Sequence, residues 1–474
     1  MDRVNVWNTF DAAARMACMD FAEGYKSFLS TNKTERECVD FFVSEAEKNG
    51  YIPLSDAIAG GRELTCGDRI YSVWQNKSMV MFEIGSRPLS EGLNIIGAHI
   101  DSPRLDVKQN PLYEDCDIAY FDTHYYGGIK KYQYVTMPLA IHGVVVKKSG
   151  ETAVINIGEE EEDPVFFVSD LLIHLAGEQM KKPGATVVEG EALDIVVGSR
   201  PISVSAHGDK ESGKESGKKV REMVLSILKD QYGIEEEDFQ SAELEIVPAG
   251  RARDAGFDRS MVLGYGQDDK VCAYPAFRAQ TQMHDLSRTS CTLLVDKEEI
   301  GSVGATGMRS RFFGNALAEL MNLCGCYSEL ALRRALANSL VLSSDVGAAF
   351  DPLYASSFEK KNTACLGAGL ALTKFTGSRG KSGANDANAE YIAHLRSIFD
   401  REKVCIQTAE LGKVDAGGGG TIAYILSLYG MNVIDSGVPV LSMHSPWEAV
   451  SKADLYEAFR GYRAFLRDAG SAVI

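Results

Sequence analysis

The chain has 474 residues and a formal net charge of -17 at pH 7, with 45% hydrophobic and 24% charged residues. This composition is that of an ordinary globular protein, and the length predicts two or three folding units. The acidic balance argues against binding to nucleic acids or to anionic membranes, because those surfaces attract basic patches.

The N-terminal segment MDRVNVWNTF has no cationic region followed by an apolar one, so we expect no secretory signal. No apolar run approaches the roughly 20 residues that cross a bilayer. The ten cysteines are scattered and form no C-x-x-C pair, which favours reduced thiols. We therefore expect a cytoplasmic protein without a membrane partner.

Helices are expected within residues 1–50. Thr34 and Glu37 have the spacing of a capping box, and Gly50 stands where a helix would end. Short apolar strands are predicted next at Ser78–Ile84 and Leu93–Ile100. The second has the near-continuous apolarity of a central strand that is buried on both faces.

The texture of the sequence changes between about residues 107 and 250, where we expect an inserted, β-rich second domain. Its predicted elements are a hairpin formed by Leu139–Val146 and Thr152–Ile157, a helix at Val168–Met180, and strands at Ala192–Val197 and Glu243–Val247. The segment GDKESGKESGKK, Gly208–Lys219, combines Gly, Ser and alternating charge, which predicts a mobile exposed loop.

Strands and helices alternate after about residue 250, which predicts a doubly wound α/β sheet. The strands are expected at Cys291–Val295, Leu340–Ser343, Val404–Thr408 and Val438–Ser442. The helices are expected at Asn315–Leu323, Ala384–Ile398 and Thr421–Tyr429. Ligands in such folds bind beyond the carboxyl ends of strands, so polar residues directly after strands are the candidates for a site.

The first candidates lie at the end of the strand in IIGAHIDSPRLD. His99 and Asp101 stand two residues apart, so their side chains point to the same face of an extended segment. A carboxylate beside a histidine can orient the ring or raise its basicity. A single His-x-Asp pair is nevertheless more often a hydrogen-bonded strand end than a metal site.

Two adjacent glutamates, Glu298 and Glu299, follow the predicted strand Cys291–Val295 in the segment TLLVDKEEIGSVGATG. Adjacent carboxylates repel each other unless protons, cations or solvent separate them. One of them could bind a metal ion while its neighbour takes a proton from the water that the metal activates. A solvated acidic turn is the alternative.

Three further segments place acidic residues or a histidine after apolar strands. GYGQDDK supplies Asp268 and Asp269, VLSSDVGAAFDP supplies Asp345, and VPVLSMHSPWE supplies His444. Each residue alone could belong to a turn or a cap. Together with His99 and the glutamate pair, the segments offer two histidines and several carboxylates at strand ends, which fits a binuclear metal site with one bridging carboxylate.

The glycine run Gly417–Gly420 precedes a predicted helix, where backbone N–H groups can contact a ligand, and we expect Gly419 and Gly420 to contact the substrate. The run is not a P-loop, because the lysine and hydroxyl residue of that motif are absent. The chain also lacks G-x-S-x-G, H-E-x-x-H and a G-x-G-x-x-G after a strand. These absences argue against a serine hydrolase, a zincin and a dinucleotide-binding protein.

In these segments the sequence resembles the metallopeptidase family of aspartyl aminopeptidase and vacuolar aminopeptidase I. The matching segments occur in the family's order and extend over almost the whole chain: GAHIDSPRLDVK, GYGQDDK, DKEEIGS, SSDVGAAFDP and SMHSPWE. The resemblance implies a doubly wound, mixed-sheet α/β zinc-peptidase catalytic domain, residues 1–106 and 251–474, with an inserted β-rich dimerisation domain, residues 107–250. Such dimers usually build a tetrahedral homododecamer with enclosed active sites.

The resemblance also implies a set of metal ligands. His99 and Asp345 would bind one ion, Glu299 and His444 would bind the other, and Asp268 would bridge the two ions. Asp269 stands where eukaryotic relatives have asparagine, so either Asp268 or Asp269 is left as the bridge. The ions would be two zinc ions per subunit, with Co²⁺ or Mn²⁺ as alternatives.

Further roles follow from the same resemblance. Glu298 would be the catalytic base and Asp101 the partner of His99. DLLIHLAGEQM resembles a segment that carries a histidine into the neighbouring subunit's active site, which makes His174 a candidate for stabilising the tetrahedral intermediate. Lys381, in SRGKSGAN, matches a lysine near the substrate pocket.

The expected function is that of a metal-dependent aminopeptidase, which removes the N-terminal residue from peptides. A related two-metal amidohydrolase, such as a carboxypeptidase or deacylase, is the first alternative. A non-enzymatic assembly scaffold is the second. The sequence leaves open whether the N-terminal residue of the substrate is acidic or neutral.

Overall fold

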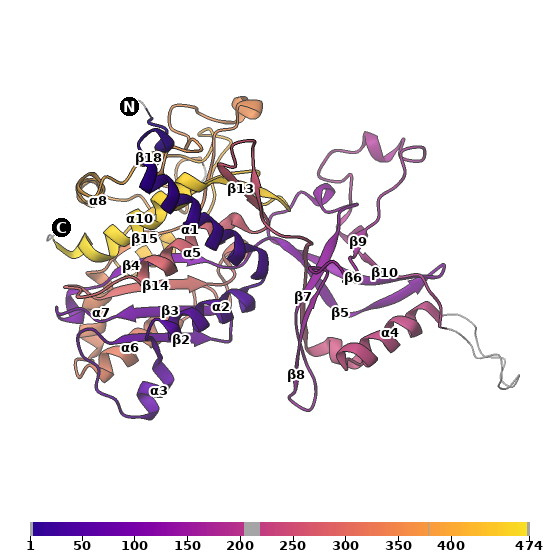
Figure 1. Ribbon diagram of the computed structural model, residues 1–474, viewed down its shortest axis with the longest axis horizontal. Helices are drawn as coiled ribbons and strands as arrows, with labels where there is room; N and C mark the ends of the chain where they lie inside the picture. Colours follow the sequence, from indigo (N-terminus) through magenta and orange to yellow (C-terminus); the bar gives the residue numbers. More distant parts are fainter. Residues whose placement is uncertain (1–2, 203–218, 378, 472–474) are drawn as a thin grey trace, which may run out of the picture. The chain divides into compact units, whose positions relative to one another are not determined.

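The computed structural model describes residues 3–202, 219–377 and 379–471 of the chain (Figure 1). Its contacts divide the chain into two compact units. The first unit comprises Met1–Ser102, Ala252–Met443 and Trp447–Ile474, and the second comprises Pro103–Arg251 with the short segment His444–Pro446. Among the described residues, no helix is long and apolar enough to cross a membrane.

A nine-stranded sheet forms the centre of the first unit (Figure 1). Its order from edge to edge is β1 (Ile52–Pro53), β2 (Arg69–Trp74), β3 (Ser78–Glu83), β14 (Ser290–Val295), β4 (Asn94–His99), β15 (Leu340–Ser343), β19 (Asn432–Gly437), β17 (Leu370–Thr373) and β18 (Ile406–Ala409). The four central strands, β14, β4, β15 and β19, run parallel. Antiparallel strands β3 and β17 flank them, so the expected mixed-sheet α/β fold is confirmed.

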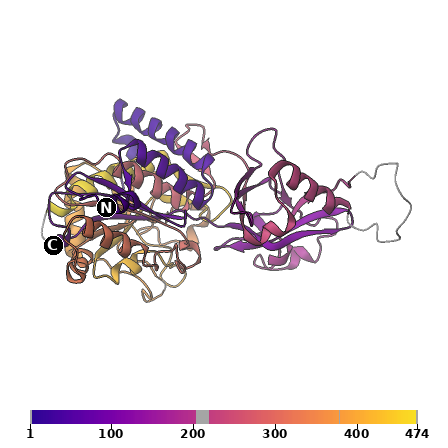
Figure 2. The same cartoon turned by 90° about the horizontal axis from the view of Figure 1, so that it is seen from below.

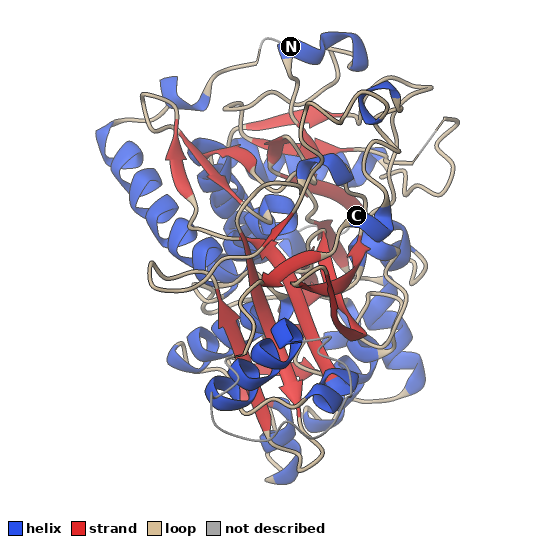
Figure 3. Ribbon diagram, turned by 90° about the vertical axis from the view of Figure 1, so that its right-hand side faces the viewer, coloured by secondary structure: helices blue, strands red, loops and turns tan. Residues whose placement is uncertain are grey.

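Helices cover both faces of this sheet, which explains why β4 and β14 are buried along their whole length (Figure 3). One face packs against α1 (Ala12–Thr31), α2 (Glu35–Lys48), α5 (Gln267–Gln280), α8 (Ala389–Arg401) and α10 (Lys452–Asp468). The other packs against α3 (Leu54–Ala59), α6 (Phe312–Leu323), α7 (Glu329–Ala337) and α9 (Ala423–Ser427).

The helices α1 and α2 lie side by side in the indigo part of the chain (Figure 2). The predicted capping box at the start of α2 is confirmed, because the Thr34 hydroxyl accepts the Glu37 N–H and the Glu37 carboxylate accepts the Thr34 N–H. Gly50 follows the end of α2 with a φ of +79°, a conformation that glycine adopts without strain.

A smaller five-stranded sheet completes the first unit. Its order is β12 (Arg253–Ala255), β13 (Met261–Gly264), β21 (Glu448–Ser451), β20 (Pro439–Leu441) and β16 (Gly347–Ala348). The strands β16 and β20 pair in parallel, with Ala348 beside Val440. This pairing links the chain just after Asp345 to the chain just before His444.

The second unit is built on a seven-stranded sheet whose neighbouring strands are all antiparallel. Its order is β8 (Thr152–Ile157), β7 (Leu139–Val146), β11 (Ala242–Pro248), β5 (Arg104–Asp115), β6 (Ile118–Tyr126), β10 (Ile195–Gly198) and β9 (Phe167–Val168). Helix α4 (Lys219–Tyr232) buries Val220 and Val224 in the core of this unit. The hairpin predicted from the sequence corresponds to β7 and β8.

The helix predicted at Val168–Met180 is wrong. The segment starts with the end of β9, continues through turns and reaches only a short 3₁₀ helix at Gln179–Lys181. Its large apolar side chains after β9 are exposed in the single chain, so no core stabilises a helical face. Of the loop predicted at Gly208–Lys219, residues 208–218 lie outside the described part of the chain, and Lys219 is the first residue of α4.

Candidate metal centre

His99 is the last residue of β4 and is 1% exposed. Its Nε2 atom lies 3.1 Å from Asp268 Oδ1, and its Nδ1 atom lies 3.2 Å from Asp101 Oδ1. The apolar strand therefore carries a single imidazole to the carboxyl end of the sheet, with an acidic side chain beside each ring nitrogen.

Asp101 connects this histidine to the pair of glutamates. Its Oδ1 accepts the backbone N–H of Glu298 and its Oδ2 accepts the backbone N–H of Glu299, each at 3.2 Å. Lys297, which precedes them, has a φ of +68°, so the chain turns sharply after β14. One buried carboxylate thus fixes both the ring of His99 and the turn that carries Glu298 and Glu299.

We expect the substitution Asp101→Asn to weaken metal binding by about tenfold to a hundredfold, the usual cost of losing a carboxylate partner of a ligating histidine. The asparagine has nearly the same shape but lacks the charge that favours the Nδ1-protonated ring. Metal titration of the metal-free protein measures the effect. An unchanged affinity would show that the backbone carbonyl of Asp101, 3.1 Å from His99 Nδ1, is sufficient to orient the ring.

Asp268 and Asp345 approach His99 from two other parts of the chain. One ligand atom from each of the three residues lies within 4.8 Å of the others. Asp345 comes two residues after β15, and its Oδ1 lies 3.9 Å from His99 Nε2. The Asp268 carboxylate is also within 4.8 Å of that of Glu299, so it occupies the middle of the cluster.

The first turn of α5 distinguishes Asp268 from Asp269. The backbone carbonyl of Asp268 accepts the Ser102 hydroxyl at 2.8 Å, and its N–H donates to Glu448 Oε2 at 3.2 Å. The carboxylate of Asp269 instead accepts the backbone N–H of His99 at 3.3 Å. Asp269 therefore braces β4, whereas the side chain of Asp268 faces the imidazole.

The charges of this cluster need a cation. Burial raises the pKa of Asp345 well above its usual value, and the charges of Glu298 and Asp268 raise it further. Burial lowers the pKa of His99, but hydrogen bonds to Asp101 and Asp268 outweigh it and raise that pKa well above its usual value. Carboxylates that crowd a buried imidazole repel one another unless protons or cations neutralise them. Imidazole nitrogen with carboxylate oxygen is a donor set that fits zinc, and it also fits cobalt and manganese.

Glu298 is close to the same cluster. Its Oε2 lies 3.9 Å from His99 Nε2, and its side chain is 15% exposed. The acidic turn is therefore only partly solvated.

The predicted substrate residues lie on neighbouring loops of the first unit. Gly419 and Gly420 belong to the segment between β18 and α9, and the Gly419 carbonyl accepts the N–H of Gly377 at 3.0 Å. Lys381 is already paired: its ammonium group lies 2.9 Å from Asp386 Oδ2 and 3.8 Å from the centre of the Phe375 ring.

The two remaining candidates group with the second unit. His174 is exposed in the segment after β9. His444 has a φ of +62°, and its Nδ1 lies 3.1 Å from the Gly128 carbonyl oxygen. Because the segment 444–446 has its contacts in the second unit, the role of His444 as a ligand is taken up below as a proposal.

Comparisons with known proteins agree with this chemistry. Residues 28–466 match the family model of aminopeptidase I zinc metalloprotease (M18). The chain is 57% identical over 464 residues to a probable M18 family aminopeptidase 1 of Clostridium acetobutylicum, covering 98% of each chain. It is 43% identical to the M18 aminopeptidase of Thermotoga maritima, whose crystal structure it matches with a TM-score of 0.91 over 98% of this chain and 99% of that one. At 19% identity it shares its fold, with a TM-score of 0.74 over 95% of this chain and 97% of that one, with a structure described as the S. cerevisiae mApe1 dodecamer.

Proposed function

The chain belongs to the M18 family of zinc aminopeptidases, and on that premise we propose that it hydrolyses the N-terminal peptide bond with two divalent metal ions per subunit and Glu298 as general base. One observation carries the proposal. Ligand atoms of His99, Asp268 and Asp345 converge within 4.8 Å at the carboxyl ends of parallel strands, where α/β folds bind their ligands.

In this proposal, His99 and Asp345 would hold one ion, Glu299 and His444 would hold the other, and Asp268 would contribute to both. The central place of Asp268 supports its bridging role over that of Asp269, because its carboxylate is near both Asp345 and Glu299. The pairing of β16 with β20 supports the choice of His444, because it joins the chain beyond Asp345 to the chain that leads into His444. Zinc is the first candidate metal, with cobalt and manganese as alternatives.

The metal ions and the side chains have separate roles in the proposed reaction. Bound divalent cations would supply Lewis acidity toward the scissile carbonyl and toward water. Glu298 takes the proton of the attacking water and delivers it to the departing amine. Asp101 holds the backbone of Glu298 and the ring of His99 in one arrangement. The free α-amino group of the peptide is anchored among the acidic side chains, which restricts cleavage to the first peptide bond.

Gly419, Gly420 and Lys381 are the proposed substrate contacts. Backbone groups of the two glycines can approach the peptide closely because no side chain intervenes. Lys381 would meet the side chain of the N-terminal residue. Its ion pair with Asp386 has to open before an acidic side chain can replace that partner.

Self-association is the proposed way in which the active site is completed. Between residues 165 and 180 the second unit exposes a run of large apolar side chains: Val165, Phe167, Leu171, Leu172, Ile173, Leu175 and Met180. Monomeric proteins rarely expose so many in one place. His174 stands inside this run, so a neighbouring copy that covers it would also receive the imidazole.

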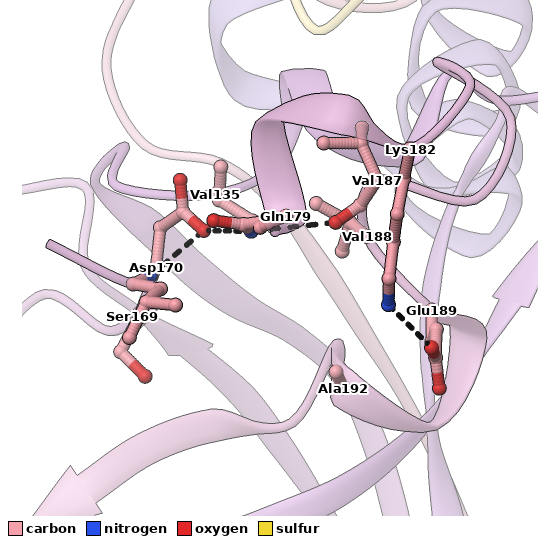
Figure 4. Close-up of a pocket in the computed structure, with 10 residues that line it drawn as sticks. Val135, Ser169, Asp170, Gln179, Lys182, Val187, Val188, Glu189 and Ala192 are labelled. Atoms are coloured by element: carbon pink, nitrogen blue, oxygen red, sulfur yellow. Dashed lines mark hydrogen bonds and ion pairs between the residues drawn. The ribbon is translucent and has the colours of Figure 1, made fainter. Parts of the chain in front are cut away.

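Polar contacts hold this segment in shape (Figure 4). Gln179 Nε2 donates to Asp170 Oδ1 at 2.8 Å, and Lys182 pairs with Glu189 at 3.0 Å. They line a cavity of about 440 Å³ within the second unit. We propose that the apolar side chains presented by this loop form the contact of dimers that build a tetrahedral homododecamer.

The test treats three forms of one peptide with the metal-loaded enzyme and compares their products. We expect the free peptide and its C-terminally amidated form to lose residues one at a time from the amino end, because only the α-amino group is recognised. The N-acetylated form should resist, and mass spectrometry of the products follows all three. Cleavage of the acetylated peptide at an undiminished rate would favour a carboxypeptidase or deacylase. Failure to cleave any form would favour a scaffold.

A further inference from the structure

A row of small or polar residues crosses the central sheet just below the metal centre. Strand register places Ser343 of β15 beside Gly97 of β4 on one side and beside Asp435 of β19 on the other. The row lies on the face that α9 covers, because a Cβ atom on Gly97 would meet the side chain of Ile422 at 3.0 Å. His99 follows Gly97 by two residues and shares its face, so this row runs directly beneath the metal ligands.

Asp435 is the charged member of this row. It is 3% exposed, and neither carboxylate oxygen makes a hydrogen bond of good geometry. Burial raises its pKa to about 7, hydroxyl groups of Thr421 and Ser343 are near enough to lower it, and the charge of Glu298 raises it again. A buried carboxylate without well-formed partners is costly, and the proposed mechanism gives Asp435 no part in the chemistry.

Thr421 is the link between Asp435 and the glycine run. It follows Gly417–Gly420 directly, and its Oγ1 accepts the N–H of Ala423 at 3.2 Å, which leaves the hydroxyl hydrogen to donate to a second group. Gly417 is also constrained, because a Cβ atom there would lie 1.8 Å from the Leu411 carbonyl oxygen. The glycine run is therefore shaped at its start by a close backbone contact and at its end by Thr421.

We propose that Asp435 is a positioning residue that holds the Thr421 hydroxyl and thereby fixes the Gly417–Gly420 segment, where the backbone of the peptide substrate is bound. The part of this inference that concerns turnover by the Asp435-containing enzyme rests on the proposed aminopeptidase function. Asp435 acts through Thr421 and touches neither the substrate nor the metal ions.

Four variants test this role: Asp435→Asn, Thr421→Val, Thr421→Ser and Ser436→Ala. The first two should lower kcat/KM for an aminoacyl substrate by about tenfold to a hundredfold, mainly through KM, because the contact between the Asp435 carboxylate and the Thr421 hydroxyl is lost. Thr421→Ser keeps the hydroxyl and should restore most of the activity. Ser436→Ala is the matched control, because Ser436 is equally buried in β19 but points to the opposite face, and it should stay within about twofold of the wild type.

A second measurement does not depend on activity. Hydrogen exchange of the amides in residues 411–421 should be faster in Asp435→Asn and in Thr421→Val than in the wild type, with metal content and exchange in β15 and β19 unchanged. The double variant should exchange no faster than the single ones, since both remove the same contact.

Two results would overturn the proposal. One is unchanged exchange in residues 411–421 together with kcat/KM within about twofold of the wild type in both single variants. The other is faster hydrogen exchange throughout β15 and β19 in Asp435→Asn, with no change in exchange in Thr421→Val. That pattern is expected of a residue that only stabilises the sheet. If the wild type cleaves no aminoacyl substrate, the proposed function fails, while the exchange experiment still decides the role of Asp435.

Discussion

Replacing Glu298 with glutamine is expected to lower kcat by about a thousandfold while the protein still binds its metal ions. The side chains have the same shape, but the amide cannot accept the proton of the attacking water, and general base catalysis is worth about 10²–10⁴ in rate. The hydrogen bond between the Glu298 N–H and Asp101 involves the backbone only, so the turn should keep its geometry. Steady-state kinetics and elemental analysis of metal content measure the two sides of the prediction.

Glu299→Gln provides the matched comparison one residue away. Glu299 is the proposed metal ligand, and its carboxylate shares the cluster with that of Asp268, so its replacement should lower metal content as well as activity. An excess of metal should recover part of the activity of Glu299→Gln and none of the activity of Glu298→Gln. If the two variants behave in the opposite way, the roles of base and ligand are exchanged. If Glu298→Gln keeps more than about a tenth of the wild-type kcat, another group accepts the proton.

The central strands could be predicted from the sequence because their signal is local. A strand such as β4 is buried on both faces and therefore apolar throughout, and the polar residue that ends it is visible in the printed chain. The hairpin of β7 and β8 is local for the same reason. The start of α8 was predicted five residues too early, at Ala384, because the pattern did not reveal Asn388 as the cap that accepts the Tyr391 N–H.

The other differences come from contacts between distant segments. The apolar spacing after β9 was interpreted as a helix, but spacing alone does not tell whether a core exists to bury it, and in the single chain these side chains are exposed. The candidate site was predicted residue by residue, whereas the distinction between Asp268 and Asp269 needed the contacts of both carboxylates. Asp435 was missed, although a carboxylate inside the apolar run NVIDSGVPVL is a visible signal, because only strand register places it below His99.

A mixture of two inactive variants is expected to recover activity if the active site needs two chains. His174→Ala removes the imidazole that a neighbouring copy would receive, and we expect it to lower kcat by about 10²–10³, the usual effect of losing one group that stabilises the tetrahedral intermediate. Glu298→Gln removes the base. In a mixed dimer one of the two sites lacks both intact groups and the other has both, so random exchange should restore about a quarter of wild-type activity.

The measurement requires the two variants to be dissociated together and reassembled, with each variant treated alone as the control. A second control replaces exposed Leu172 and Ile173 with aspartate in the His174→Ala chain, which should prevent association and abolish the recovery while each chain keeps its metal ions. Native mass spectrometry confirms that mixed assemblies have formed. If their activity is no higher than the sum of the two variants measured alone, His174 lies outside the active site. Recovery that survives the Leu172 and Ile173 substitutions would mean that another surface of the chain brings the two copies together.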